Sequence, residues 1–481
     1  MKKNGAFRRA AALLAALSIT VSLAAPAFAD IYYIDDGDII ITKDENGRQT
    51  VKRGESDTNE IVDSGEIIIT TREQTITTQE SDLEGPAAED SGFGPVVEDN
   101  YQPAQPEDAE EPKDDDQPES TEEPEDADQP EGADRKESTE EPKAADQQEN
   151  AEESENTDRQ EDTDQQAAPA DAVPAAPAPA NGFCKNIITV INKAATALKL
   201  TLKDVKIDVS DTGKNTGYPW TSDEGKAALS VQGNGNVEIE LDGNNELKSG
   251  PHRAGLEKNT STSTGTLTLK DDNNEAGSLT ATGGDWGAGI GNGGYYGNSD
   301  NRSGENITIT GGTVNATGGW GGAGIGGGYY GSGKNITIKG GTVTATGGEE
   351  GAGIGGGYYY GGGYYGNGYY GNGENIKITD GTVNATGGWG GAGIGGGGGG
   401  GNGAGGNGKN ITIIGGTVTA GGGYRGAGIG GGISGSGKNI TITGGTVNAD
   451  GGTNAAGIGG GATGSGSNVT VSGAAQVTAI A

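Results

Sequence analysis

Cysteine is almost absent from this chain of 481 residues, which contains only Cys184. No disulfide can form within the chain, so stability has to come from packing and backbone hydrogen bonds. Zinc fingers and thiol redox sites are excluded for the same reason. We expect Cys184 to act as a small apolar residue.

After the first 29 residues there is no apolar run of about 18 residues either, so we expect no segment there to span a membrane.

Histidine and positive charge are scarce as well. The chain has one histidine, His252, and 32 basic against 68 acidic residues, for a net charge of −36. No basic patch can displace counterions from a phosphate backbone, so no nucleic acid is expected as a partner. Enzymes that cleave polysaccharides need neighbouring carboxylates or a carboxylate set with a strong base. Because the acids of the repeats are scattered and His252 fits a turn, we expect a protein that is not an enzyme.

The first 29 residues have the layout of a secretory signal peptide. Basic residues between Lys2 and Arg9 precede the apolar stretch AALLAALSITVSLAAPA, which runs into Ala27-Phe28-Ala29. This pattern predicts export and a mature chain that begins at Asp30. We therefore expect the protein to be secreted, and to be extracellular or associated with the cell surface.

Two segments of different composition separate residues 1–29 from the repeats. Residues 30–83 contain short β-branched runs such as DGDIIITK and SGEIIITT, and are predicted to form a small β-rich N-terminal segment. Residues 84–182 are rich in proline, carry a net charge of −28 and lack aromatic residues after Tyr101. Such a segment cannot bury enough apolar surface to offset its chain entropy, so we predict a disordered acidic linker.

Residues 183–481 are built from a glycine-rich repeat. The motif GAGI or a variant of it begins at residues 253, 287, 322, 351, 391, 426 and 455. An asparagine before an ITI-like run recurs at residues 306, 335, 375, 410, 439 and 468. The basic spacing is 29 residues, and the longer spacings contain extra glycine and tyrosine residues after GAGIGGG. Insertions confined to one point of a repeat indicate a surface loop.

Each repeat carries three short runs with the alternation of a β-strand, such as GAGIG, NITIT and TVNAT. In the last of these, Val314 and Ala316 alternate with polar residues, so one set of side chains points inward. Three strands without a helix between them can form parallel sheets if each repeat winds into one coil that pairs with the next. The sequence therefore predicts an all-β fold, a right-handed parallel β-helix of about nine coils with aliphatic residues inside and glycine at the corners.

The two ends of the predicted β-helix raise separate questions. Residues 186–200 fit an amphipathic helix with Ile187, Ile191, Ala194 and Leu198 on one face, which would cap the first coil. The last coil ends in NVTVSGAAQVTAIA without a polar capping segment, and an exposed terminal strand is an edge for pairing. We expect a partner or another part of the chain to cover this coil, and self-association is one way to do so.

The recurring asparagines have two interpretations. Stacked side-chain amides can hydrogen-bond from coil to coil, and several of these residues also lie in N-x-T sequons. We expect an internal ladder, because the regular spacing alone accounts for the column.

Aromatic residues are rare and fall at one corner of the predicted coil. Some lie one or two residues before GAGI, and tyrosine pairs lie in the inserted loops. Exposed rings stack on the apolar faces of sugars and cost little entropy to order, which makes them candidates for carbohydrate contact. Rings that only cover glycine backbone, or tyrosines that pack on one another, are the alternative. The candidate residues are Trp286, Trp320, Trp389, Tyr424, Tyr329 and Tyr330.

Two further surface features carry alternatives. Outward threonines such as Thr313, Thr342 and Thr382 form a regular array of the kind found on β-solenoids that bind ice, although threonine is also common on solvated strand faces. The clusters ELDGNNE (240–246) and KDDNNE (270–275) make calcium a candidate ligand, although neither has EF-hand spacing. No other metal or cofactor is expected.

The motifs together resemble one protein family. IELDGNNELKSG, RAGLE, GTLTL, GSLTATGG and the recurring GAGIGGG and NITITGGTVNATGG are similar to the secreted right-handed β-helix carbohydrate-binding proteins of Firmicutes, over residues 230–481. This resemblance implies a plant-wall or pectin-type polysaccharide as partner and an association with calcium. No binding residue of that family can be placed on this sequence.

We therefore expect a secreted, non-catalytic protein that binds a plant cell-wall or microbial polysaccharide. One alternative is an adhesin-like surface protein that acts through its glycine- and tyrosine-rich loops. A polysaccharide lyase is the other.

Overall fold

The computed structural model describes residues 29–54, 60–62, 65–72, 182–213, 224–258, 261–273, 275–294, 303–361, 371–401 and 404–481. These residues belong to one compact unit. The predicted signal peptide lies outside them except for Ala29, and the predicted acidic linker except for Gly182. In the described part of the chain, no helix has the length and apolarity needed to cross a membrane.

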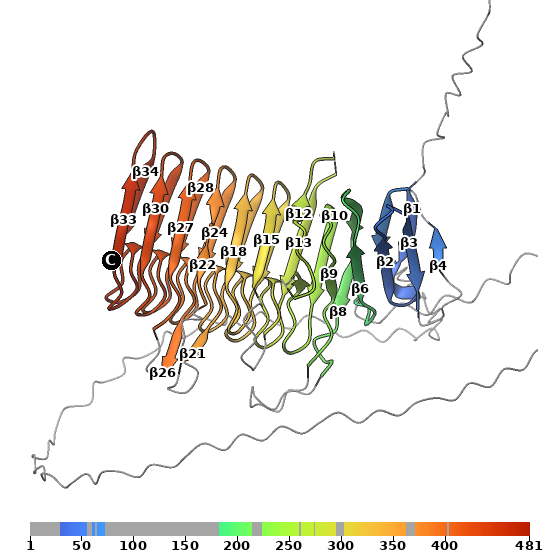
Figure 1. Cartoon of the computed structure of the whole chain (residues 1–481), viewed down its shortest axis with the longest axis horizontal. Helices are drawn as coiled ribbons and strands as arrows, with labels where there is room; N and C mark the ends of the chain where they lie inside the picture. Colours follow the sequence, from blue (N-terminus) through green and yellow to red (C-terminus); the bar gives the residue numbers. More distant parts are fainter. Residues whose placement is uncertain are drawn as a thin grey trace, which may run out of the picture. The chain divides into compact units, whose positions relative to one another are not determined.

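Strands of successive repeats pair in parallel and form three sheets, which we call sheets A, B and C (Figure 1). Sheet A comprises β1 (Asp30–Tyr33), β5 (Ile67–Thr70), β7 (Leu198–Lys203), β10 (Val237–Lys248), β12 (Leu267–Lys270), β15 (Gly304–Ile309), β18 (Gly333–Ile338), β22 (Gly373–Glu374), β23 (Lys377–Ile378), β27 (Gly408–Ile413), β30 (Gly437–Ile442) and β33 (Gly466–Val471). Sheet B comprises β2 (Ile39–Lys43), β6 (Ile188–Asn192), β9 (Leu229–Gln232), β11 (Leu256–Glu257), β14 (Ile290–Gly291), β17 (Ile325–Gly326), β20 (Ile354–Gly355), β25 (Ile394–Gly395), β29 (Ile429–Gly430) and β32 (Ile458–Gly459). Sheet C comprises β8 (Lys206–Asp208), the second half of β10, β13 (Gly277–Thr282), β16 (Thr313–Thr317), β19 (Thr342–Thr346), β24 (Thr382–Thr386), β28 (Thr417–Gly421), β31 (Thr446–Asp450) and β34 (Gln476–Ile480).

Equivalent residues of successive repeats are paired in register. Ile338 of sheet A pairs with Ile309 and Ile378 in the coils on either side. Val343 of sheet C has the same relation to Val314 and Val383. These side chains are fully buried, and burying one aliphatic side chain contributes about 1.5–3 kcal/mol. The repeated column is the core of a right-handed parallel β-helix, which confirms the predicted fold class.

The number of coils also agrees with the sequence. Within the described residues, sheet C passes through nine strands between β8 and β34. The predicted helix over residues 186–200 is wrong, because this segment forms β6 and β7. In β6 the buried residues Ile188 and Val190 alternate with the half-buried residues Thr189 and Ile191, and β-branched residues favour strands.

Gly326 shows why glycine recurs after the short strands of sheet B. Its φ angle of 132° is one that residues with side chains rarely adopt. A Cβ atom on Gly326 would also collide with the carbonyl oxygen of Gly355 in the next coil. The close stacking of backbone on backbone at this corner therefore requires glycine.

The described residues of the N-terminal segment add a further coil to the β-helix. β2 pairs in parallel with β6, and β5 pairs in parallel with β7. The short 3-10 helix η1 (Ile34–Asp36) follows β1, and β3 (Gln49–Arg53) and β4 (Glu60–Val62) extend sheet B in antiparallel fashion. Whether residues 30–83 dock on the repeats could not be read from the sequence, and the structure shows that their described part does.

Lys206 connects the two chain segments that flank residues 73–181. Its backbone N–H donates to Thr71 Oγ1 over 2.8 Å, and its carbonyl oxygen accepts from the Cys184 N–H over 3.0 Å. Cys184 is buried, as expected, and burial raises the pKa of its thiol to about 12. The described residues on both sides of residues 73–181 therefore bond to the same strand, β8.

In the last described coil, aliphatic side chains are exposed to solvent. Val469, Val471 and Ile480 are 40%, 49% and 57% exposed, whereas their equivalents in the coil before are buried or polar. β33 pairs with β30 and β34 pairs with β31, each on one edge. In the described part of the chain no strand pairs with the other edge of β33 or β34, and the expected covering partner stays a prediction.

Candidate functional site

Aromatic side chains gather at one corner of the β-helix, in the turns between sheets C and B and in the loops that follow sheet B. We call this group the aromatic corner. It is divided into a packed part and an exposed pair. The packed part contains Trp286, Trp320, Tyr329, Tyr330, Tyr358 and Tyr359, and the exposed ring of Tyr360 contacts it at Tyr358. The exposed pair is Trp389 and Tyr424.

The centre of the packed part is closed to any ligand. Trp286 and Tyr329 are 1% and 2% exposed, and their rings stack with centroids 4.5 Å apart. The ring of Tyr358 packs on Tyr329 from the next coil, and His252 contacts Trp286 edge-on at 4.6 Å. His252 has a φ of 65° in a turn, as the sequence indicated. Trp286 and Tyr329 therefore stabilise the corner and present no ring face to solvent.

Trp320 and Tyr330 are half-buried at the margin of this packed part. The Trp320 Nε1–H donates to Glu349 Oε2 over 2.7 Å, and its ring contacts the Tyr358 ring edge-on. The Tyr330 hydroxyl donates to the carbonyl oxygen of Tyr360 over 2.9 Å. These contacts hold both side chains against neighbouring coils, so only part of each ring is accessible.

Trp389 and Tyr424 form the most accessible ring surface among the six predicted site residues. They are 46% and 48% exposed, and they follow β24 and β28, which are adjacent strands of sheet C. Their rings are stacked with centroids 5.6 Å apart and planes inclined by 26°. The Arg425 guanidinium lies 5.9 Å and 5.6 Å from the two ring centroids, within the range of a cation–π contact. Sequence spacing placed both rings at this corner but gave no sign of Arg425.

A two-stranded ribbon adjoins the corner, formed by β21 (Tyr359–Gly361) and β26 (Gly399–Gly401). It is drawn apart from the stacked coils in Figure 1. The ribbon was not predicted, because its second strand is a run of glycines that has no alternation of side chains. Two consecutive inserted loops thus pair with each other as the coils do.

Glu350 contacts Gly398, the residue that precedes β26 of this ribbon. Its carbonyl oxygen accepts from the Gly398 N–H over 2.6 Å, and its carboxylate is next to Gly390 and Gly398, where a Cβ atom would overlap it. Oε2 has no hydrogen-bond partner among the described residues. Burial raises the pKa of Glu350 to about 7, although the Gly390 N–H acts to lower it, and the neighbouring Glu349 raises it further. Sequence reasoning missed Glu350, because its burial depends on two loops whose pairing was not predicted.

The asparagine column is an internal ladder, as predicted. From Asn335 onward, each Nδ2 donates to the Oδ1 of the asparagine in the preceding coil, for example from Asn375 to Asn335 over 3.0 Å. The Asn306 Nδ2 donates to the Thr264 carbonyl oxygen. The same contact joins all six members of the column, at 2.9–3.0 Å. All six have positive φ angles between 53° and 58°, a conformation that asparagine tolerates better than most residues. The side-chain amides of this column therefore bond to one another from coil to coil.

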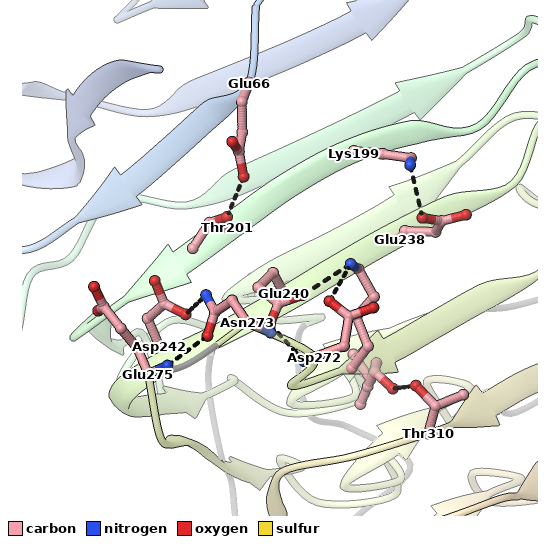
Figure 2. Close-up of polar contacts among 12 residues, drawn as sticks. Glu66, Lys199, Thr201, Glu238, Glu240, Asp242, Asp272, Asn273, Glu275 and Thr310 are labelled. Carbon is pink, nitrogen blue, oxygen red and sulfur yellow. Dashed lines mark hydrogen bonds and ion pairs between the residues drawn. The ribbon is translucent and has the colours of Figure 1, made fainter. Parts of the chain in front are cut away.

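The two acidic clusters proposed as calcium ligands meet on the outer face of sheet A (Figure 2). Glu240 Oε1 accepts from the backbone N–H groups of Asp272 and Asn273, and Asn273 Nδ2 donates to Asp242 Oδ1 over 2.7 Å. Lys270 Nζ lies 2.9 Å from Glu240 Oε2 and 2.8 Å from Asp272 Oδ1. Burial raises the pKa of Asp242. The cluster fastens the loop after β12 onto β10.

The described residues contain no group of three or more His, Cys, Asp and Glu side chains that could hold a metal ion. Calcium binding therefore has no assigned ligand set in this part of the chain.

Comparison with known proteins supports the fold and leaves the ligand open. The sequence model of the family described as "Beta helix repeat" matches residues 307–329, 336–358, 376–398, 411–433 and 440–462. No curated protein and no solved structure matched the chain.

Proposed function

We propose that this protein is a secreted, non-catalytic polysaccharide-binding protein whose contact residues are Trp389 and Tyr424. The observation that carries the proposal is the stacking of these two half-exposed rings on adjacent coils. Each ring keeps about half of its surface exposed for contact with a sugar, and rings held by the coils lose little entropy on binding. Arg425 adds hydrogen-bond donors beside the rings.

The surroundings of the acidic residues support a binding role rather than catalysis. Glu240 and Asp242 are bonded to backbone N–H groups and an amide, and Lys270 is paired with Glu240. His252 packs against Trp286. A lyase or hydrolase needs such groups free to contact substrate.

Affinity electrophoresis tests the proposal, with pectin and xylan in the gel and a parallel pull-down on peptidoglycan. We expect one of these polysaccharides to retard the parent chain, and Trp389→Ala or Tyr424→Ala to weaken binding about two- to tenfold, since stacking is worth about 0.5–1.5 kcal/mol per ring. Tyr360→Ala, which removes an exposed ring outside the pair, should bind like the parent. The measurements are made with and without calcium. Equal retardation of parent and both ring variants would contradict the assignment.

An adhesin-like role is the second candidate, and the ribbon is the observation that favours it. Tyr360 on β21 is 50% exposed. β21 pairs with β26, a strand of three glycines, so no side chains on β26 cover the backbone of the ribbon. A protein that acts through this ribbon would lose surface attachment with Tyr360→Ala and keep it with Trp389→Ala, the reverse of the result expected above.

A further inference from the structure

The outer face of sheet C presents a regular grid of short polar side chains. From β13 to β28, every outward position pairs in register with the same position of the next coil. Neighbouring coils are about 4.8 Å apart, and alternate residues of one strand are about 6.6 Å apart. The residues of this grid are Ser278, Thr280, Thr282, Thr313, Asn315, Thr317, Thr342, Thr344, Thr346, Thr382, Asn384, Thr386, Thr417, Thr419 and Gly421.

The grid carries no charge, in a chain of which 21% of the residues are charged. Sheet A in the same coils is different. There the outer column runs Glu305, Lys334, Glu374 and Lys409, with a lysine at Lys377 as well. Charged side chains are therefore present on these coils, and the grid from β13 to β28 is a neutral area beside them. Sheet C carries charged residues again before and after this grid, at Glu246 and Lys248 in β10 and at Asp450 in β31.

The threonine hydroxyls of the grid are available to a ligand, whereas the Ser278 hydroxyl bonds to the Gly243 carbonyl oxygen and to Asn244 Oδ1. Its threonine side chains are half-buried or exposed, and in the described structure they make no hydrogen bond to another protein group. Thr310 and Thr379, which lie in the turns after sheet A, instead direct their hydroxyls to the carbonyl oxygens of Leu269 and Ile338. Each free hydroxyl can both donate and accept.

The exposed ring pair borders this grid. Trp389 and Tyr424 each lie three residues beyond the last residue of β24 and β28. Rings for stacking and hydroxyls or amides for hydrogen bonding are thus carried by the same two coils. This is the combination of groups that a sugar chain requires.

We propose that the outer face of sheet C, from β13 to β28, binds the extended chains of a neutral polysaccharide, with Trp389 and Tyr424 at its edge. The inference rests on the proposed polysaccharide-binding function and adds the surface and the ligand class. Sugar hydroxyls exchange hydrogen bonds with the threonine hydroxyls and asparagine amides, each worth about 0.5–1.5 kcal/mol. A neutral grid offers no counter-charge to a uronic acid, so the face selects an uncharged glycan.

The test compares depletion of the protein from solution by insoluble cellulose and chitin with affinity electrophoresis in polygalacturonate. Thr344→Lys/Asn384→Lys places two charges at the centre of the grid. Thr412→Lys on sheet A is the matched control, because Thr412 pairs with a position that is already lysine, Lys377. We expect the parent and the control to bind one of the neutral solids, and the double variant to lose binding at least about tenfold. Circular dichroism establishes that each variant is folded.

Three outcomes would overturn the inference. Binding that Trp389→Ala abolishes but Thr344→Lys/Asn384→Lys leaves intact would keep the proposed function and exclude the face. Binding to polygalacturonate alone would exclude the neutral ligand. Inhibition of ice recrystallisation by the parent and not by the double variant, without binding to any glycan, would assign the face to ice and remove both proposals.

Discussion

At the scale of single residues, Glu350 is a carboxyl group whose surroundings disfavour its charged form. Its carboxylate lies next to Gly390 and Gly398, with one oxygen unpartnered in the described structure and a pKa raised to about 7 by burial. Glu349 and Tyr358 are the titratable groups that influence it, and Arg425 lies at the ring pair in the adjacent turns. Because the folded-state pKa is higher than the ordinary value, folding favours the protonated form.

This linkage predicts that the corner loosens as the pH rises. The stabilisation is fully present below about pH 4.5 and is lost as the pH rises through about 7. We expect hydrogen-exchange protection of the Gly390 and Gly398 amides, corrected for intrinsic exchange, to fall up to about tenfold between pH 5 and 8, a value discounted for the partial exposure of the carboxylate. Glu350→Gln should remove this pH dependence and Glu349→Gln should retain it. A protection factor that does not change with pH in the parent would contradict the account.

At the scale of elements, the asparagine ladder connects the starts of the NITI strands. Each member supplies two things at once, a left-handed backbone conformation and an amide that bonds to the neighbouring coils. A substitution can remove these two contributions separately.

We expect Asn375→Ala to lower the free energy of unfolding by about 2 kcal/mol, because it removes two ladder bonds and adds strain at positive φ. Asn375→Gly should cost less, since glycine tolerates that conformation. Asn384→Ala is the control, an exposed asparagine in an extended strand, and should change stability by less than about 0.5 kcal/mol. Urea denaturation followed by circular dichroism measures all three. Equal stability of Asn375→Ala and Asn384→Ala would show that the ladder contributes nothing.

At the scale of the whole molecule, much of the fold follows from alternation and spacing. The inward Ile, Val and Ala residues and the 29-residue period predict strands, coils and the ladder, because each depends on contacts between identical positions of neighbouring repeats. Other features depend on contacts that no repeat encodes. Trp286 is covered by Tyr329 from the next coil, on which Tyr358 packs in turn, and the β21–β26 ribbon consists partly of glycines. The pairing of β5 with β7 joins segments separated by the long acidic insertion.

Residues 186–200 show how two signals can conflict. Their apolar spacing fits both a helix face and a strand alternation, so spacing alone does not exclude the helix predicted for them. The available neighbours decide the outcome: β6 lies between β2 and β9, and each side offers a strand edge that a helix could not satisfy.

The central claim is that successive coils stack in register, and cross-linking tests it most directly. In a Cys184→Ser background, Thr344→Cys/Asn384→Cys places cysteines at positions that pair between β19 and β24. Paired strands bring Cα atoms within the roughly 4.4–6.8 Å that a disulfide needs. Thr342→Cys/Thr386→Cys places them at opposite ends of the same two strands. The account predicts rapid formation of an intramolecular disulfide on mild oxidation in the first variant and none in the second. Cross-linking of the second variant, or failure of the first, would contradict the stacked coils and the surface built on them.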